Sequence, residues 1–186
     1  AWLDGAGIDL LRGRGRLAGE RLVDVEAADG TVTRFEAARA VVVATGTGAA
    51  LPPVPGLADA LPWDNRQMTS AKGAPRRLLV VGGGVVGVEM AQAWKWLGSE
   101  EVTIVEMAER ILAREEPFVA DELGSALTRL GVTIRTGARL ESVRRAAADA
   151  PVVATVTLSD GSTVDIEADE NLAAAGTRPN TSYIGA

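Results

Sequence analysis

Apolar and polar positions follow a strand pattern between residues 8 and 45. Short runs that alternate or are β-branched occur at 21–26, 31–35 and 41–44. Asp29-Gly30 stands between the first two runs and favours a tight hairpin turn, because both residues tolerate positive φ. We therefore predict a small antiparallel meander here, leading into a strand at 41–44.

Strand and helix patterns alternate from residue 78 onwards. Buried strands are predicted at 78–81, 102–105 and 132–134, with a helical period of 3.6 residues between them. The apolar face of the first helix is predicted to be Val86, Met90, Ala93, Trp94 and Leu97, and that of the second Val119, Leu123, Ala126, Leu127 and Leu130. Strands separated by helices of this length indicate βαβ units and a parallel sheet.

The hairpin pattern occurs a second time near the end of the chain. Residues 156–168 repeat residues 25–37, with Asp160-Gly161 at the position of Asp29-Gly30. Each copy then runs into an apolar segment that ends in Gly-Thr. Two interpretations stay open. The first is that the two hairpins are unrelated and merely look alike, as hairpins often do. The second is that the chain holds two related halves, each with a three-stranded meander that feeds a strand ending in glycine.

A glycine-rich motif follows the strand at 78–81. It is G-x-G-x-x-G, formed by Gly82, Gly83, Gly84, Val85, Val86 and Gly87. A strand before it and a helix after it are the context in which this motif binds a dinucleotide. The first glycine permits the tight turn, the second lets the pyrophosphate approach the backbone, and the third lets the helix pack on the strand. Free N–H groups at the helix N-terminus then attract the phosphates.

Two acidic residues extend this hypothesis. Glu106 ends the second strand, nineteen residues after Gly87, where a carboxylate accepts hydrogen bonds from the adenosine ribose. It would repel a 2′-phosphate, which favours NAD over NADP, although Arg110 and Arg114 lie near enough in sequence to weaken that inference. The alternative for Glu106 is a solvated charge. Glu89, early in the helix, either stabilises the helix N-terminus or approaches the nicotinamide.

Composition excludes several mechanisms. The 186 residues contain no Cys and no His, so they supply no thiol nucleophile, imidazole base, disulfide or Cys/His metal site. A net charge of −6 argues against nucleic acid and anionic membranes as partners. No apolar run approaches the ~20 residues of a membrane span. Without a signal peptide or cysteines, the expected location is cytoplasmic.

Four segments together resemble the flavin-dependent pyridine nucleotide-disulfide oxidoreductases, the family of dihydrolipoamide dehydrogenase and mercuric reductase. They are 42–47 with the Pro-rich 51–56, the fingerprint at 79–89, the strand at 102–106, and the return segment 173–180. The resemblance implies a Rossmann-like α/β FAD/NAD(P)-binding fold, with a parallel sheet and an antiparallel three-stranded meander. It also explains the repeat, since the two nucleotide-binding domains of this family share one architecture.

The family's cofactor positions can be carried over where residues match. Besides the fingerprint, Glu89 and Glu106, the resemblance implies NAD contacts at Leu140 and Gly176. It implies flavin contacts at Gly15, Thr45, Gly46 and Thr47. The expected organisation is a piece of the FAD domain at 1–50, a connector at 51–77, the NAD domain at 78–170, and a return toward the FAD domain at 171–186.

Several parts of the family pattern are absent from these residues. They include the flavin fingerprint, the redox-active Cys pair and the dimerisation domain. One residue is also inserted near Ser99, and Thr177 replaces the usual Arg. We therefore expect a central fragment of a homodimeric parent that passes hydride between NAD(H) and FAD, feeding a disulfide or another acceptor. The fragment alone would be inactive, with no catalytic residue. A non-catalytic NAD-binding module and a flavoprotein without a Cys pair, such as an NADH oxidase or ferredoxin reductase, are the alternatives.

Overall fold

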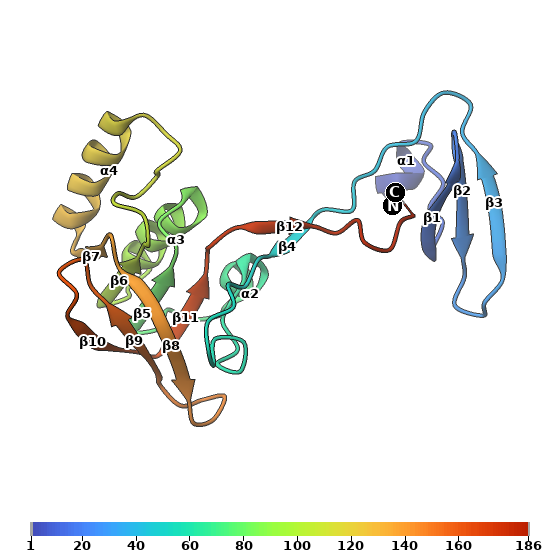
Figure 1. The fold of residues 1–186 in the computed structure, drawn as a ribbon. Coiled ribbons are helices and arrows are strands. Elements are labelled where there is room, and N and C mark those ends of the chain that lie inside the picture. The colour runs from blue at the N-terminus through green and yellow to red at the C-terminus, as the bar shows by residue number, and fades with distance from the viewer. Residues whose placement is uncertain (1, 186) are drawn as a thin grey trace. The chain divides into compact units, whose positions relative to one another are not determined.

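The chain divides into two compact units in the computed structural model, which describes residues 2–185 apart from the side chain of Asn65 (Figure 1). Unit 1 contains the described residues up to Thr47 together with those from Pro179 onwards. Unit 2 contains Gly48–Arg178. Each unit has its own sheets.

Unit 1 is built on an antiparallel meander. After α1 (Trp2–Gly5), the strands β1 (Arg14–Gly19), β2 (Leu22–Glu26) and β3 (Val32–Glu36) pair in the order β1-β2-β3. The predicted hairpin at Asp29-Gly30 is confirmed, because Gly30 has a φ of 84° and Asp29 accepts a hydrogen bond from the Thr31 amide at 2.9 Å. The first strand, β1, was not predicted, because it lies before the three strand-like runs at 21–26, 31–35 and 41–44.

The predicted strand at 41–44 is wrong. Among the described residues no strand forms there, and β4 (Thr47–Ala49) begins only after Gly46. Val42 and Val43 are 85% and 47% exposed. A β-branched run has the side chains for a strand, but a strand also needs a neighbour for its backbone hydrogen bonds. No described strand pairs with this segment.

Unit 2 contains the predicted parallel sheet. Its strands are β5 (Arg77–Val81), β6 (Glu101–Val105), β7 (Val132–Arg135) and β11 (Glu170–Ala173), in the order β11-β5-β6-β7. All three pairings are parallel. The helices α3 (Val85–Trp96) and α4 (Pro117–Leu130) connect β5 to β6 and β6 to β7. The α/β fold with a parallel sheet and a three-stranded meander is thereby confirmed.

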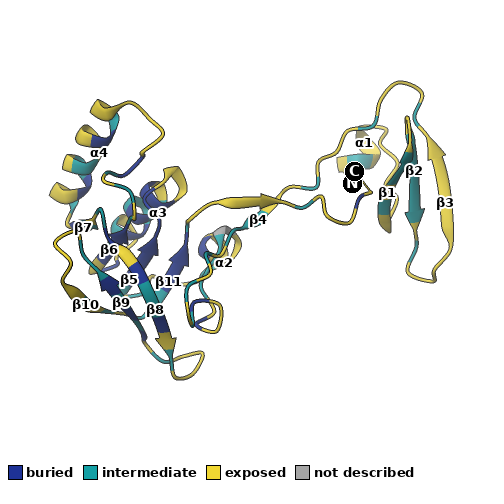
Figure 2. Cartoon of the chain, in the orientation of Figure 1, coloured by how far each residue is buried: buried dark blue, intermediate teal, exposed yellow. Residues whose placement is uncertain are grey.

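The two faces of this sheet carry two separate cores. Leu78 and Val80 of β5 pack with residues of α3 and α4 on one face, and Leu79 and Val81 pack with a second meander on the other. That meander consists of β8 (Arg139–Arg145), β9 (Val152–Thr157) and β10 (Thr163–Ala168), in the order β10-β9-β8. Figures 1 and 2 show the central strands buried between these two layers. The continuous apolar run of β5 reflects burial on both faces.

The predicted apolar face of α3 is partly wrong. Trp94 is buried as expected, but Val86 is 42% exposed and Leu97 is 66% exposed. The face that packs on the sheet is Gly87, Val88, Ala91 and Trp94. Gly87 and Ala91 are small, so the helix axis can approach the strands at these positions. These two buried residues each follow a larger residue of the predicted face, Val86 and Met90.

Residues 51–77 pack into unit 2. Leu57, Ala60 and Met68 are buried, and α2 (Asn65–Ser70) begins with a capping box between Asp64 and Gln67. Trp63, for which the pattern gave no role, bridges to Leu172 of β11, and its ring lies 5.8 Å from that of Trp94.

The hairpin repeat is visible as repeated geometry. In β2–β3 the amide of Ala27 donates to Thr31 and the amide of Gly30 to Ala27. In β9–β10 the corresponding amides are those of Leu158, donating to Ser162, and Gly161, donating to Leu158. Asp160 also accepts from the Ser162 amide at 2.9 Å, as Asp29 does from Thr31. Two turns with the same bonds support the interpretation of two related halves.

Asn171 is the buried polar residue of β11. Its side chain is fully buried, and neither its oxygen nor its nitrogen has a hydrogen-bond partner in the described part of the chain. Asn171→Leu is therefore expected to raise the free energy of unfolding by about 1–3 kcal/mol, because a desolvated amide is replaced by an apolar group of similar volume. Urea unfolding would measure the change. A loss of stability in Asn171→Leu would show that the amide is satisfied.

Candidate dinucleotide-binding site

The glycine-rich turn connects β5 to α3 at the carboxyl end of the parallel sheet. Gly82 has a φ of 109°, in the region that favours glycine, and its amide donates to Val105 of β6 at 2.9 Å. A Cβ atom at Gly82 would lie 2.6 Å from the carbonyl oxygen of Ala174, just after β11. The turn is thus packed between the ends of the two strands that flank β5.

Gly87 is the contact point between α3 and the turn. A Cβ atom there would overlap the carbonyl oxygen of Gly82 and would lie 3.3 Å from Cγ1 of Val80. Only a residue without a side chain allows this close approach of the helix. The role predicted for the third glycine of the motif, helix packing, is what this geometry describes.

The first turn of α3 is open. Gly84 is its N-cap, no side chain caps the helix, and a Cβ atom at Gly84 would meet nothing within 4 Å. Val85 and Val86, the first two residues of the helix, are 52% and 42% exposed. The first N–H groups of a helix have no partner within the helix and carry a partial positive charge. The backbone here can therefore be approached closely by an anion.

Glu106 joins this turn to the loop that follows β6. Its Oε2 accepts a hydrogen bond from the Gly83 amide at 2.6 Å, and its Oε1 accepts one from the Ala108 amide at 2.7 Å. The backbone of Glu106 is also fixed, since its amide donates to Arg135 and its carbonyl accepts from Ala138. The carboxylate is half-buried and pre-oriented beside the glycine turn. Each of its oxygens retains a lone pair for a further donor.

The loop after Glu106 packs back on the same turn. The Leu112 amide donates to the Gly83 carbonyl at 2.8 Å, and the Ile111 side chain lies against Gly83. The guanidinium of Arg110 donates to the carbonyls of Ala113 and Glu115, both at 3.0 Å. Arg110 thus stabilises its own loop.

The remaining predicted NAD residues, Gly176, Leu140 and Glu89, lie on three different segments. Gly176 lies two residues after Ala174, and its carbonyl accepts from the Ala50 amide at 2.9 Å. Leu140, on β8, is only 9% exposed and packs into the core beneath the second meander. Glu89 is exposed on α3. The structure thus gathers the glycine turn, Glu106 and the Ala174–Gly176 segment.

The predicted flavin residues lie in unit 1. Gly15 is on β1, and Thr45, Gly46 and Thr47 lead into β4, which pairs with β12 (Thr177–Pro179). Asn180 holds this segment: its amide donates to Gly46 at 2.9 Å, and its side chain donates to the Thr45 carbonyl at 3.2 Å.

Sequence reasoning did not find Ala108 and Ala174. Ala108 contributes a backbone amide to Glu106, and Ala174 contributes a backbone carbonyl against Gly82. Neither contact uses a side chain, so residue type carries no signal for it. Only the sequence offset from a recognised motif could have pointed to them.

These features define a class of protein. The fold is a Rossmann-like FAD/NAD(P)-binding fold. Its features here are the parallel sheet, the glycine turn before an uncapped helix, and the carboxylate at the end of the next strand. A family model confirms the class more narrowly, because the pyridine nucleotide-disulphide oxidoreductase model matches residues 2–186. The chain belongs to this family of flavin-dependent oxidoreductases.

Curated relatives agree with this assignment. The chain is 36% identical over 184 residues to dihydrolipoyl dehydrogenase 3 of Pseudomonas aeruginosa, covering 96% of this chain and 38% of that protein. It is 31% identical over 177 residues to a mercuric reductase of Bacillus cereus, covering 95% of this chain and 26% of that protein. The chain therefore spans well under half of these relatives.

Solved structures show the same correspondence. LpdA from Mycobacterium tuberculosis matches with a TM-score of 0.77 and 33% identity, over 98% of this chain and 39% of that one. RclA from Escherichia coli, an HOCl-induced flavoprotein disulfide reductase, matches with a TM-score of 0.78 and 25% identity, over 98% of this chain and 40% of that one.

Among the described residues, no group of three or more Asp, Glu, His or Cys side chains is arranged to hold a metal ion. In residues 2–185 no helix has the length and apolar character needed to cross a bilayer.

Proposed function

We propose that unit 2 binds NAD(H) at the carboxyl end of its parallel sheet. The observation that carries this proposal is the Glu106 carboxylate, held 2.6 Å from the Gly83 amide beside the open first turn of α3. Within residues 82–87 the amides of Gly82 and Gly83 are bonded to Val105 and Glu106, so the N–H groups at the start of α3 would receive the pyrophosphate. Glu106 would accept hydrogen bonds from the ribose hydroxyls. Gly176 would line the same end of the sheet, and Leu140 would support the adenine side from the core.

NAD(H) is favoured over NADP(H) in this proposal. A 2′-phosphate would bring its negative charge to the Glu106 carboxylate, whose two oxygens are fixed by backbone amides and cannot turn away. Arg110, the first arginine after Glu106 in the sequence, already donates to the carbonyls of Ala113 and Glu115. Arg114 is exposed, so the preference for NAD(H) rests on the charge of Glu106.

The parent protein would exchange a hydride between NAD(H) and FAD and pass the electrons to a disulfide or another acceptor. When bound, the two cofactors supply the redox chemistry, and the protein supplies binding and orientation. In this chain the glycine turn and Glu106 would bind and orient the adenosine half and the pyrophosphate of NAD(H). Glu89, exposed on that helix, fits two roles: contact with the nicotinamide end or stabilisation of the helix N-terminus.

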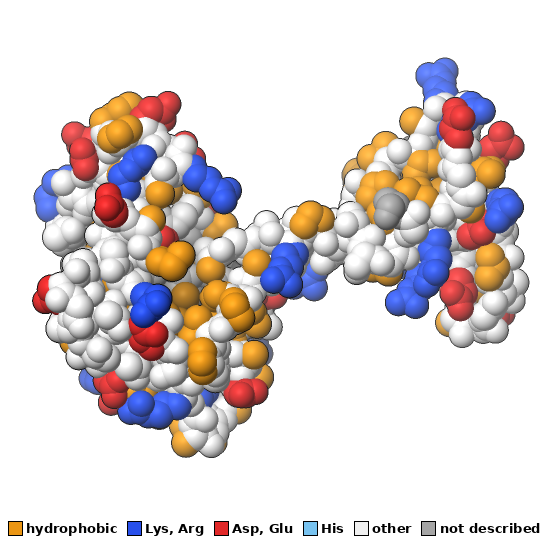
Figure 3. All heavy atoms as spheres, viewed as in Figure 1, with side chains coloured by type: hydrophobic (Ala, Val, Ile, Leu, Met, Phe, Trp, Pro, Cys, Tyr) orange, Lys and Arg blue, Asp and Glu red, His pale blue; other side chains and the backbone are white. Residues whose placement is uncertain are grey.

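Unit 1 would contribute part of the flavin site through Gly15, Thr45, Gly46 and Thr47. Counted back from Gly46 and Gly176, Val42 and Val43 correspond to Leu172 and Ala173 of β11, which are 0% and 4% exposed. Their own exposure supports the proposal that the rest of a flavin domain covers them in the parent, which would also be a homodimer. Other hydrophobic side chains reach the surface of unit 1 (Figure 3). Ile8, Leu10 and Leu11 are 47%, 54% and 55% exposed. The chain of 186 residues would bind NAD(H) without catalysing a reaction.

Glu106→Ala tests the nucleotide site. We expect NADH to bind this variant about 10- to 100-fold more weakly than the native chain, because hydrogen bonds to a charged group contribute ~1.5–3 kcal/mol. Titration of NADH fluorescence would measure both affinities, and NADPH titrated in parallel would bind the native chain more weakly than NADH. Native-like affinity of Glu106→Ala would remove Glu106 from the ribose role.

Glu109→Ala is the matched control, since Glu109 is an exposed acidic residue in the same loop. It should bind NADH as the native chain does. Glu106→Ala also removes the two hydrogen bonds from backbone amides to the carboxylate. Thermal unfolding of both variants therefore shows whether weaker binding comes from the missing ribose contact or from a disordered loop. Failure of the native chain to bind NADH at millimolar concentrations would contradict the proposal as a whole.

A further inference from the structure

Sulfur chemistry in this chain is confined to methionine. The sequence has three methionines and no cysteine. Met68 is 2% exposed and Met90 is partly buried against the core between α3 and the sheet, whereas Met107 is 74% exposed. The thioether of Met107 is therefore the one most open to a dissolved oxidant, since oxidation of methionine follows solvent access.

Met107 also directly follows Glu106, the residue that we assign to the ribose. It is the middle residue of a turn closed by the hydrogen bond from the Ala108 amide to Oε1 of Glu106, at 2.7 Å. The other oxygen of the same carboxylate holds the Gly83 amide at 2.6 Å. The side chain of Met107 thus projects into solvent from a short, fixed turn next to the carboxylate that we assign to the ribose.

We propose that Met107 is an oxidation site coupled to dinucleotide binding: bound dinucleotide shields its thioether, and its sulfoxide weakens dinucleotide binding. The inference rests on the proposed function of this site. With hydrogen peroxide as oxidant, one peroxide oxygen is transferred to sulfur, the O–O bond breaks, an S=O bond forms and the other oxygen leaves as water. Sulfur loses two electrons and the peroxide gains them. Sulfoxide reductases reverse this step.

The coupling has a simple physical basis. Covering an exposed thioether with a ligand removes apolar surface from water, which favours binding. Covering a sulfoxide desolvates a polar oxygen instead, and both neighbouring amides, those of Gly83 and Ala108, are already bonded to Glu106. By linkage, a ligand that binds the thioether form more tightly also protects it.

The test is graded oxidation of the chain with hydrogen peroxide, followed by peptide mass spectrometry. Hydrogen peroxide is chosen because Trp2 and Trp96 are also exposed, and stronger oxidants attack tryptophan. We expect Met107 to be oxidised at least about tenfold faster than Met68 and faster than Met90. Saturating NAD⁺ should slow oxidation at Met107 and leave the rate at Met68 unchanged.

Binding after oxidation gives the second readout. Native chain oxidised at Met107 should bind NADH several-fold more weakly, whereas Met107→Leu should keep its affinity through the same treatment. Met90→Leu is the matched control and should lose affinity as the native chain does. If NADH binds but Met107 is neither first oxidised nor protected, the inference fails and the proposed function stands. If NADH does not bind the untreated chain, both fail.

Discussion

Gly87→Ala is expected to destabilise unit 2 by at least about 2–3 kcal/mol and to abolish measurable NADH binding. The new Cβ atom would overlap the carbonyl oxygen of Gly82, which belongs to the turn itself. That oxygen is backbone, so relief requires α3 to move away from β5, and the free N–H groups of the helix move with it. Urea unfolding and NADH fluorescence would measure the two effects.

Gly84→Ala separates binding from folding. Its Cβ atom would meet nothing within 4 Å, and Gly84 has a φ of −74°, which any residue adopts. We therefore expect a change of no more than about 0.5 kcal/mol in the free energy of unfolding. NADH affinity should nevertheless fall at least about tenfold, because the added methyl group occupies space that the pyrophosphate needs.

Gly124→Ala in α4 is the matched control for both changes. A Cβ atom there would lie 3.8 Å from Ile111, an ordinary contact, so the variant should fold and bind NADH normally. Normal binding by Gly84→Ala would contradict the assignment of the pyrophosphate to this turn. Normal stability of Gly87→Ala would contradict the close packing of α3 on Gly82.

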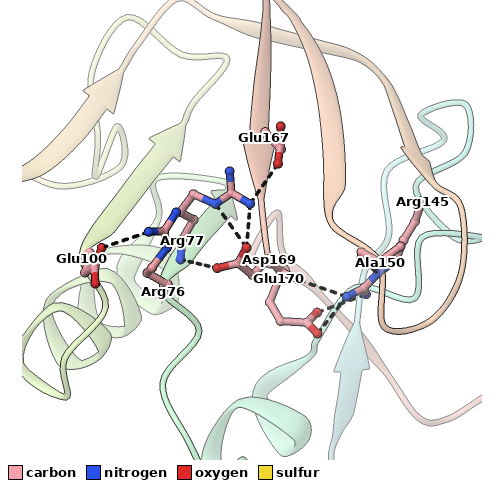
Figure 4. A network of polar contacts seen from close by, with 8 residues as sticks. All are labelled: Arg76, Arg77, Glu100, Arg145, Ala150, Glu167, Asp169 and Glu170. Atoms are coloured by element: carbon pink, nitrogen blue, oxygen red, sulfur yellow. Dashed lines mark hydrogen bonds and ion pairs between the residues drawn. The ribbon is translucent and has the colours of Figure 1, made fainter.

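Arg145→Met is expected to cost about 3–5 kcal/mol of stability, because it leaves a carboxylate and several carbonyls without their cation. The guanidinium is 4% exposed and contacts Glu170 through both carboxylate oxygens, at 2.8 and 3.1 Å (Figure 4). It also donates to the carbonyls of Ala60, Ala150 and Asp169. One side chain thus ties residues 51–77, the β8–β9 hairpin and the start of β11 together.

Arg144→Met is the control, one residue away on the same strand. Arg144 is 64% exposed and pairs with Asp165, itself 52% exposed, at 3.1 Å. An exposed pair of this kind contributes little, so we expect a change below about 0.5–1 kcal/mol. Thermal or urea unfolding of the two variants gives the comparison. Similar losses in both would show that burial of Arg145 does not determine its contribution.

A second ion-pair cluster fixes the start of the parallel sheet. Arg77 contacts Asp169 at 2.7 Å and Glu167 at 2.9 Å, and its amide also donates to Asp169. The hydrogen bonds from Arg77 hold the pKa of the Asp169 carboxyl below its usual value. Both clusters lie at the opposite end of β5 from the glycine turn, so they stabilise the sheet at a distance from the candidate nucleotide site.

Arg144 and Arg145 show what the sequence leaves open. Two adjacent arginines on a strand point to opposite faces, but nothing in their type says which one is buried. That choice depends on the register of β8 against β9, which shifts between Leu140 and Ser142. The same holds for α3, where Gly87 and Ala91 are buried together with Val88 and Trp94, whereas Val86 is exposed.

The sequence by itself determined the alternation of strands and helices from residue 78 to 134, the two Asp-Gly hairpins and the glycine turn. These depend on local spacing, and spacing is written directly in the chain. Tertiary structure decided three further matters: that Glu106 holds the Gly83 amide, that Arg145 rather than Arg144 is buried, and that 41–44 forms no strand. Each depends on which distant segment lies alongside, because hydrogen bonds and burial are properties of a pair of segments and not of either one alone.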